Sequence, residues 1–391
     1  MKFMHVSDLH LDRPFEGLSI VPQNLENKLV KNAQEVLQRL LTLMDQENVE
    51  ALFVVGDTFH QAHISYDMQQ LWVFFLEQCL SLGVQPFVIF GNHDYYDESR
   101  YWIPWPKEVI AWYSEEVETK YWTSRYGERL AISAFSYRHP HLTTYKIDEF
   151  PSRDPKVDFH IGLYHGQMTG QYAPFQIEKM KQRQYHYWAL GHIHRYQALD
   201  HHIIYPGTPQ GKKRGEWNEG RIVIGTLSHQ QEDWQAIDVA PIYYEVKEQY
   251  LEEQTIPELI DDIKKSLRHD KYTVVDWRLS LGISAGDIAL EELNSRDFKE
   301  FLNSGIALGD MGAIIHFEKK KGTDVTALLS ESLQEELQNN YRRDDVFMSV
   351  GDTLFNDVTL EKEAHQLLEN KDGIIEEAFE SFKEDLMEGE A

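Results

Sequence analysis

Apolar residues alternate between short runs and helical repeats over the first part of the chain. Lys2–Val6, Ala51–Val55 and Pro86–Phe90 are short apolar runs of the length expected for buried strands. Between them, Asn24–Asn48 and Asp67–Ser81 carry apolar residues at the spacing of an amphipathic helix. This alternation of strand and helix predicts an α/β sheet whose strands run parallel.

After Tyr95 the pattern changes, because long helical repeats become scarce and short apolar runs follow one another. The expected strands are Leu130–Ser136, Phe159–Tyr164, Tyr187–Leu190, His202–Tyr205, Gly220–Gly225 and Trp234–Val239. One helix is predicted near Phe175–Arg183. We therefore expect an α/β fold in which two sheets form a β-sandwich flanked by helices.

Two further units are predicted after this domain, which spans residues 1–240. Residues 241–324 are expected to form a small α+β capping domain, with a helix at Pro257–Arg268 between strands near Tyr243–Glu248 and Val274–Leu281. Residues 325–391 are acidic and carry helical periodicity, which predicts a helical C-terminal segment.

Composition narrows the possible functions of this 391-residue chain. Its 65 acidic and 38 basic residues give a net charge of −27, which repels nucleic acid unless metal ions or basic patches intervene. The single Cys79 excludes a disulfide framework and multi-cysteine metal sites, and indicates a reducing compartment. We see no targeting segment and no apolar run long enough for a membrane span, so we expect a cytoplasmic protein without membrane association.

Residues with metal-binding side chains follow five of the predicted strands. They lie in Asp8-Leu9-His10, Gly56-Asp57-Thr58-Phe59-His60, Gly91-Asn92-His93-Asp94, Tyr164-His165-Gly166 and Gly191-His192-Ile193-His194. In open α/β sheets, ligands bind outside the carboxyl ends of the strands, so one cleft can collect all five segments. Carboxylate, imidazole and amide ligands suit Mn²⁺, Fe or Zn²⁺, and their number favours a two-metal site for phosphoryl transfer.

In this order, these segments resemble those of the calcineurin-like metallophosphoesterase superfamily. Within it, the opening Phe3-Met4-His5-Val6-Ser7-Asp8-Leu9-His10-Leu11 and the ending of Gly56-Asp57-Thr58-Phe59-His60 are most similar to the SbcD/YhaO-type DNA repair exonucleases, relatives of the Mre-type nuclease. Tyr205-Pro206-Gly207-Thr208-Pro209 also fits that group. The resemblance covers roughly residues 1–240.

The resemblance implies a role for each matching residue. Asp8, His10 and His194 would hold one ion, Asn92, His165 and His192 the second, and Asp57 would bridge the two ions, most simply Mn²⁺, with Fe, Zn²⁺ or Mg²⁺ as alternatives. His93 would protonate the leaving oxygen or stabilise the transition state, and Asp94 would orient His93. His60 would contact the substrate phosphate or the nucleic-acid strand; a solvated loop histidine is the alternative.

The implied activity is dimetal-dependent DNA exonuclease or endonuclease action, in which metal-activated water hydrolyses a phosphodiester during DNA repair. The same metal core would also serve a phosphoesterase for small phosphodiesters or phosphoproteins, which the negative charge favours. A third hypothesis is a non-catalytic subunit that binds DNA or an ATPase. The intact set of metal ligands argues against this hypothesis.

Three segments outside the motifs leave alternatives open. The aromatic residues between Tyr95 and Trp122 would either stack bases or cover a core or dimer contact. Lys212-Lys213-Arg214 would meet phosphates or form a solvated loop. Amphipathic spacing over 360–386 predicts helices that dock on a partner or fold back on their own domain. The resemblance implies a partner there, an SMC-like coiled-coil ATPase of the SbcC/YhaN type, and a homodimer.

Overall fold

The structure is a computed structural model that describes residues 1–18, 23–61, 63–230, 232–251, 271–281 and 312–321, with short pieces of the rest. The chain divides into two compact units. One comprises Met1–Gln249, Gln254–Arg278 and Asp287–Glu318, and the other comprises Tyr250–Glu253, Leu279–Gly286 and Lys319–Ala391. The candidate site lies in the first unit.

Parallel strands form the centre of the first sheet, as the opening pattern predicts. Its order is β12-β11-β1-β2-β3-β4, with β1 to β4 parallel and β11 antiparallel to both neighbours. The bounds are β1 (Lys2–Val6), β2 (Ala51–Val55), β3 (Gln85–Ile89), β4 (Ile110–Ala111), β11 (Arg221–Leu227) and β12 (Glu232–Asp238).

The second sheet has the order β5-β6-β7-β8-β10-β9, with parallel strands from β6 to β10 and antiparallel strands at both edges. Its strands are β5 (Glu118–Thr123), β6 (Arg129–Ala134), β7 (Phe159–His165), β8 (Tyr187–Gly191), β9 (Gln197–Asp200) and β10 (Ile203–Tyr205). The two-sheet sandwich is therefore confirmed. The edge strands β4, β5 and β9 were not predicted, because they are very short or mostly solvent-exposed and lack an apolar run.

Successive side chains of the central strands point alternately to the two faces of the first sheet and form the core on both sides. Phe3, Phe53 and Phe87 face the second sheet, where they pack against Ile132, Leu163 and other residues of its inner face. The intervening residues of the first sheet, such as Met4, Leu52 and Val88, contact the helices instead. A strand buried on both faces needs apolar residues at every position, which explains the continuous apolar runs.

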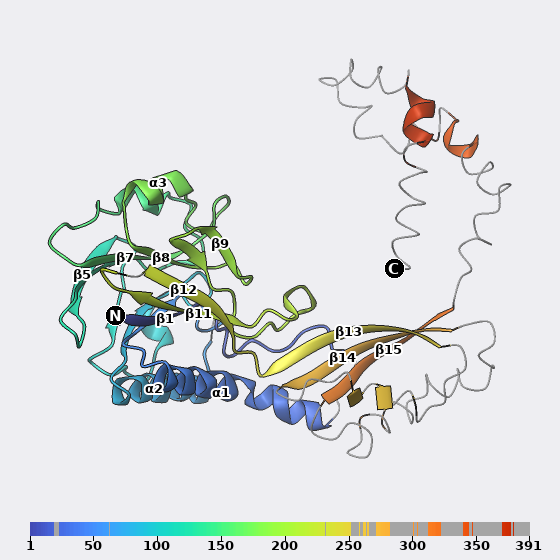
Figure 1. Cartoon of the computed structure of the whole chain (residues 1–391), viewed down its shortest axis with the longest axis horizontal. Coiled ribbons are helices and arrows are strands. Elements are labelled where there is room, and N and C mark those ends of the chain that lie inside the picture. The colour runs from blue at the N-terminus through green and yellow to red at the C-terminus, as the bar shows by residue number, and fades with distance from the viewer. Residues whose placement is uncertain are drawn as a thin grey trace. The chain divides into compact units, whose positions relative to one another are not determined.

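The sandwich has α-helices on its outer faces (Figure 1). α1 (Gln23–Gln46) and α2 (Tyr66–Ser81) contribute Leu37, Leu40, Trp72 and Leu76 to the layer beneath the first sheet. Ser65 caps α2, because its Oγ accepts a hydrogen bond from the Met68 N–H at 3.3 Å. On the other side, the short α3 (Ile177–Gln182) packs with the outer face of the second sheet.

A third sheet follows the sandwich, with the order β13-β14-β15. Its strands are β13 (Ile242–Leu251), β14 (Tyr272–Leu281) and β15 (Gly312–Lys321), of which β15 was not predicted. The helix predicted at Pro257–Arg268 lies mostly outside the described residues, as do the helices predicted over 360–386, although residues 371–376 are helical. No helix in the described part of the chain is long and apolar enough to cross a membrane.

Candidate dinuclear metal site

The polar segments singled out in the sequence all follow strands of the two facing sheets. In the first sheet they follow β1, β2 and β3, and in the second sheet they follow β8 or, for His165, form the last residue of β7. Because these strands are parallel within each sheet, their carboxyl ends lie along one edge. The fold therefore brings together side chains that lie far apart in the sequence.

Four of these residues adopt a left-handed backbone conformation. The φ angles are 53° at Asp8, 40° at His10, 55° at Asp57 and 101° at His192, although none of these residues is glycine. Each such conformation costs on the order of 1–3 kcal/mol and persists where the surroundings enforce it. Here backbone hydrogen bonds between the loops after β1 and β2 enforce the left-handed conformation. The Asp8 N–H donates to Gly56 O at 3.1 Å, and the His10 N–H donates to Asp57 O at 3.0 Å. Strain of this kind is concentrated at functional sites.

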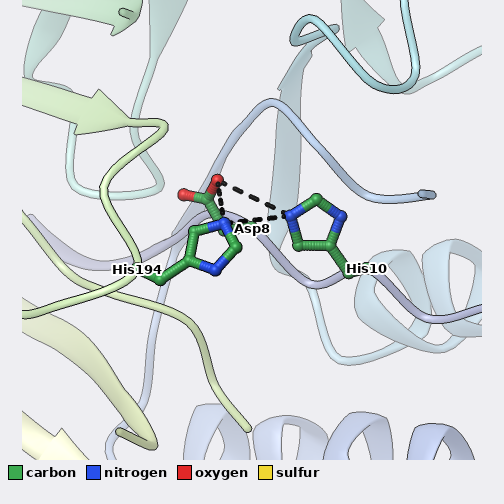
Figure 2. A group of neighbouring side chains, drawn as sticks. All are labelled: Asp8, His10 and His194. Carbon is green, nitrogen blue, oxygen red and sulfur yellow. Dashed lines mark hydrogen bonds and ion pairs between the residues drawn. The ribbon is translucent and has the colours of Figure 1, made fainter. Parts of the chain in front are cut away.

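Asp8, His10 and His194 form the first ligand group (Figure 2). Asp8 Oδ1 lies 3.5 Å from His194 Nε2 and 4.0 Å from His10 Nε2, and the two Nε2 atoms are 3.1 Å apart. The Asp8 and His10 side chains are almost completely buried. Three donor atoms thus converge on a small volume, with the partly exposed His194 on its solvent side.

The two oxygens of Asp8 have different surroundings. Oδ2 accepts hydrogen bonds from Ser7 Oγ at 2.6 Å and from the His192 N–H at 2.9 Å. Oδ1, which faces the two imidazoles, is buried without a hydrogen-bond partner. A buried carboxylate oxygen is costly unless it is paired or coordinates a cation, so this environment fits a metal ion.

The second ligand group contains Asp57, His165 and His192. The Asn92 side chain joins it, with Oδ1 at 3.1 Å from His165 Nε2 and 3.0 Å from His192 Nδ1. The His165 Nδ1 lies 2.9 Å from Val55 O, and a proton on Nδ1 directed at that carbonyl leaves Nε2 free as a ligand. This group offers a carboxylate, an amide oxygen and two imidazoles.

Asp57 connects the two groups. Its Oδ1 accepts the His93 N–H at 2.9 Å, which fixes the orientation of the carboxylate. Its Oδ2 lies 3.7 Å from His10 Nε2 in the first group and 3.5 Å from His165 Nε2 in the second. One carboxylate oxygen therefore faces both groups, as a ligand shared by two metal ions would.

In the second ligand group, the Asp57 carboxylate favours one positive charge on its neighbour His165. Burial lowers the pKa of His165, but the neighbouring Asp57 carboxylate outweighs it and raises this pKa to about 9. Burial lowers the pKa of His192 to about 3, and the charge of His165 adds to this effect. Without a metal, one proton on His165 compensates Asp57; a metal ion would replace that proton, so the ligand set fits divalent metals.

His60 and His93 form a stacked pair beside the first group. Their ring centroids are 4.4 Å apart, and each ring lies 5.1 Å from the His10 ring in an edge-on orientation. Asp12 fixes the His60 backbone, because its two carboxylate oxygens accept the N–H groups of His60 and Gln61 at 2.6 and 3.0 Å. His60 is therefore held at the site and is not on a loose loop.

Asp94 occupies a different place from that predicted. Its Oδ1 accepts the N–H groups of Asp57 and Gly91 at 3.0 and 2.7 Å, and its Oδ2 accepts that of Thr58 at 2.7 Å. With three backbone donors on its two oxygens, the Asp94 carboxylate ties the loops after β2 and β3 together. It thereby positions Asp57 and the backbone of His93, whereas the sequence assigned it to the His93 ring.

Two supporting side chains escaped the sequence analysis. Glu216 Oε1 lies 2.6 Å from His194 Nδ1 and 3.3 Å from Arg13 Nη1. Gln167 Oε1 lies 3.2 Å from His192 Nε2. Neither residue belongs to a recognisable motif. Glu216 follows His194 by 22 positions, so the spacing in the sequence does not indicate that the two side chains interact.

The basic cluster Lys212-Lys213-Arg214 as a whole forms neither a phosphate-binding patch nor a solvated loop, the two alternatives that the sequence left open. Lys212 is buried, and its Nζ donates to three backbone carbonyls, the shortest contact being 2.8 Å to His10 O. Arg214 pairs with Asp276 at 3.0 Å. Lys212 thus supports the loop that carries the first ligand group, and Arg214 links the sandwich to β14.

The chain belongs to the calcineurin-like phosphoesterase family, whose sequence profile matches residues 1–196. All the residues of the two candidate metal-ligand groups lie within this matched range.

Among individual proteins, the chain is 32% identical over 221 residues to YhaO of Bacillus subtilis, described as an uncharacterized metallophosphoesterase. The match covers 54% of this chain and spans 54% of the length of YhaO. The solved structure of GAP50, described as the anchor in the inner membrane complex of Plasmodium, aligns with 61% of this chain and 84% of its own. Its TM-score is 0.38 at 11% identity, so it adds nothing to the assignment.

Proposed function

We propose that this protein is a dimetal phosphodiesterase that hydrolyses DNA with Mn²⁺. The observation that carries the proposal is the stacked His60–His93 pair beside two ligand groups joined by Asp57. Membership of the calcineurin-like phosphoesterase family supports phosphoester hydrolysis. The imidazole pair next to the metal ligands supports cleavage of a phosphoester whose leaving oxygen needs a proton donor.

We propose a place for each metal ion. Asp8, His10 and His194 would hold one ion, Asn92, His165 and His192 the other, and Asp57 would bind both. When bound, the two ions supply Lewis-acid activation of water and of the phosphoryl group. Mixed oxygen and nitrogen ligands are compatible with Mn²⁺.

The two histidines outside the ligand groups have complementary roles in the proposal. The His93 ring contacts both the His60 ring and the His10 ring, and it would donate a proton to the leaving oxygen. Burial lowers the pKa of His60, and the charges of His93 and Arg13 lower it further, which favours the neutral imidazole. Its Nδ1 is buried without a hydrogen-bond partner.

A phosphoesterase for small phosphodiesters is the second candidate, and the net charge of −27 favours it. Long DNA is repelled by such a charge at a distance, whereas a small diester is affected much less.

Digestion of end-labelled single- and double-stranded DNA tests the proposal, with Mn²⁺, with Mg²⁺ and with chelator. We expect Mn²⁺-dependent shortening that His93→Ser abolishes while the metal content stays unchanged. His139→Ser is the matched control, because His139 is exposed and pairs only with Glu115 among its described contacts. Hydrolysis of bis(4-nitrophenyl) phosphate without any DNA cleavage would favour the small-diester enzyme.

We further propose that the C-terminal segment binds an SMC-like coiled-coil ATPase and that the enzyme acts as a cytoplasmic homodimer. The amphipathic spacing over 360–386 supports the first point, and the free, buried Cys79 fits a reducing compartment. Co-purification of the ATPase with the full chain, but not with a chain truncated after residue 324, tests the partner. Sedimentation analysis tests the dimer.

A further inference from the structure

An aromatic cavity adjoins the loop that carries Asn92 and His93. It has a volume of 580 Å³, and its walls include Phe90, Tyr96, Trp105 and Tyr113. Small-molecule pockets of roughly 300–1,000 Å³ lined by aromatic residues are typical ligand sites. The segment that the sequence analysis singled out for its aromatic residues therefore forms a built cavity with open ring surfaces.

Ring contacts hold the inner wall of this cavity in place. The Trp105 ring is stacked on Phe90 with centroids 5.4 Å apart, and the Tyr96 ring lies 4.6 Å from that of Tyr113. Tyr113 is 43% exposed and Tyr121 is 64% exposed, so aromatic surface remains uncovered. A planar ring entering the cavity would find rigid partners for stacking.

The charge of the cavity is opposite to that of the protein. Its lining contains Lys107 and Lys120 but no carboxylate, in a chain with 65 acidic residues. Lys107 is exposed, whereas Lys120 lies 4.9 Å above the Trp112 ring and donates from Nζ to Ala111 O at 2.6 Å. The cavity thus offers aromatic surfaces for a planar ring and, at Lys107, an exposed cation for an anionic group attached to it.

Two hydrogen bonds connect the cavity to the proposed catalytic loop. Tyr101, which lines the cavity, donates from its hydroxyl to Asp94 O at 2.7 Å. The adjacent Arg100 donates to His93 O at 3.1 Å. Phe90 in the cavity wall precedes Gly91 and Asn92 directly in the chain. The same short segment therefore shapes both the cavity and the metal site.

We propose that this cavity binds a nucleobase of the substrate, with its phosphate near Lys107. The inference rests on the proposed hydrolysis of DNA and adds a subsite that recognises a base by stacking. Base stacking on aromatic side chains tolerates different sequences, which suits a nuclease without sequence preference.

Binding of deoxyadenosine monophosphate to the full-length, chelated protein tests the subsite by calorimetry. We expect binding that Tyr113→Ala weakens roughly fivefold or more, which is the lower end of what aromatic stacking contributes per base. Lys107→Ala, at an exposed position, should also weaken it, and deoxyribose 5-phosphate should bind poorly. Tyr126→Ala is the control, because Tyr126 is 75% exposed and lies outside the cavity lining.

Three results would overturn the subsite: no nucleotide binding, equal binding of deoxyribose phosphate, or an equal loss in Tyr126→Ala. A change of oligomeric state in Tyr113→Ala without nucleotide binding would show instead that the cavity is covered by a second copy.

A kinetic comparison separates this inference from the proposed function. An abasic site next to the cleaved bond should raise KM for the wild type but not for Tyr113→Ala, while hydrolysis of bis(4-nitrophenyl) phosphate stays equal. If the wild type cleaves no DNA, the proposed function fails, whereas nucleotide binding still decides whether the cavity is a base site.

Discussion

His194 and Glu216 form a short contact at the edge of the metal site, with Nδ1 and Oε1 2.6 Å apart. Glu216 is buried, and Arg13 and Lys213 each approach the same oxygen to 3.3 Å. Burial opposes the charged imidazole, but Glu216 raises the pKa of His194 above its ordinary value. A carboxylate that holds the outer nitrogen of an imidazole fixes the tautomer and directs the other nitrogen at the metal.

Replacing this carboxylate should weaken the metal site without removing a ligand. For Glu216→Gln we expect the affinity for Mn²⁺ to fall roughly 10- to 100-fold, as when other supporting partners of metal-binding histidines are changed. Titration of Mn²⁺ into the chelated protein measures this. Glu219→Gln is the matched control, because Glu219 lies three residues away and pairs with Arg195 at 3.7 Å. Unchanged affinity in Glu216→Gln would show that His194 needs no such support.

The shared carboxylate should control both metal ions. Because Asp57 Oδ2 faces both ligand groups, we expect Asp57→Asn to reduce the metal content from two ions per chain to none. His194→Gln removes a ligand of the first group alone and should leave one ion. Metal analysis after gel filtration measures the stoichiometry. Retention of one ion in Asp57→Asn would contradict a bridging role.

Much of this site could be predicted from the sequence because its residues follow apolar runs directly. Asp8 and Asp57 stand two residues after β1 and β2, and parallel strands force such positions to meet. The support of His194 by Glu216 could not be predicted, because it depends on how a loop folds back in space. Asp94 illustrates the same limit: the sequence places it beside His93, but only the three-dimensional loop shows that its oxygens accept backbone N–H groups.

The strands of the fold also differ in how well the sequence predicts them. Strands buried on both faces, such as β2 and β7, carry continuous apolar runs and are visible in the sequence. The edge strand β5 has no fully buried residue, and cross-strand pairing with β6 determines its conformation. The sequence therefore predicts no strand there, and it marks these residues only as part of an aromatic segment.

A glycine at the end of β8 should be required for packing of the two sheets. A Cβ atom at Gly191 would lie 2.0 Å from Val55 O and 2.8 Å from His165 Nδ1, and the backbone oxygen cannot move away. We expect Gly191→Ala to lower the free energy of unfolding by about 1–3 kcal/mol or more, as overpacking does. Urea denaturation of the chelated protein measures this effect separately from metal binding.

Gly215 provides the matched control for this substitution. A Cβ atom there would meet no atom within 4 Å, so Gly215→Ala should leave stability nearly unchanged. Equal stability of both variants would show that the loop after β8 relaxes freely.

His5 should make the stability of the sandwich depend on pH below neutrality. It is buried between the sheets, where Nδ1 lies 3.0 Å from Tyr187 Oη and Nε2 3.0 Å from Leu190 O. Burial lowers the pKa of His5 to about 3 from its ordinary 6.5. Between these values the unfolded chain binds a proton that the folded chain does not, so stability falls as the pH falls. The slope approaches about 1.4 kcal/mol per pH unit for one such group.

His5→Gln removes the titrating group and should flatten this dependence, although it lowers stability at neutral pH by disturbing two hydrogen bonds. The unfolding free energy of the wild type minus that of the variant should rise with pH from about 3 to 6.5 and be constant above. Urea denaturation in chelator across this range measures the difference without metal release. A flat difference for His5→Gln would mean that His5 takes up a proton in the folded protein as readily as in the unfolded chain.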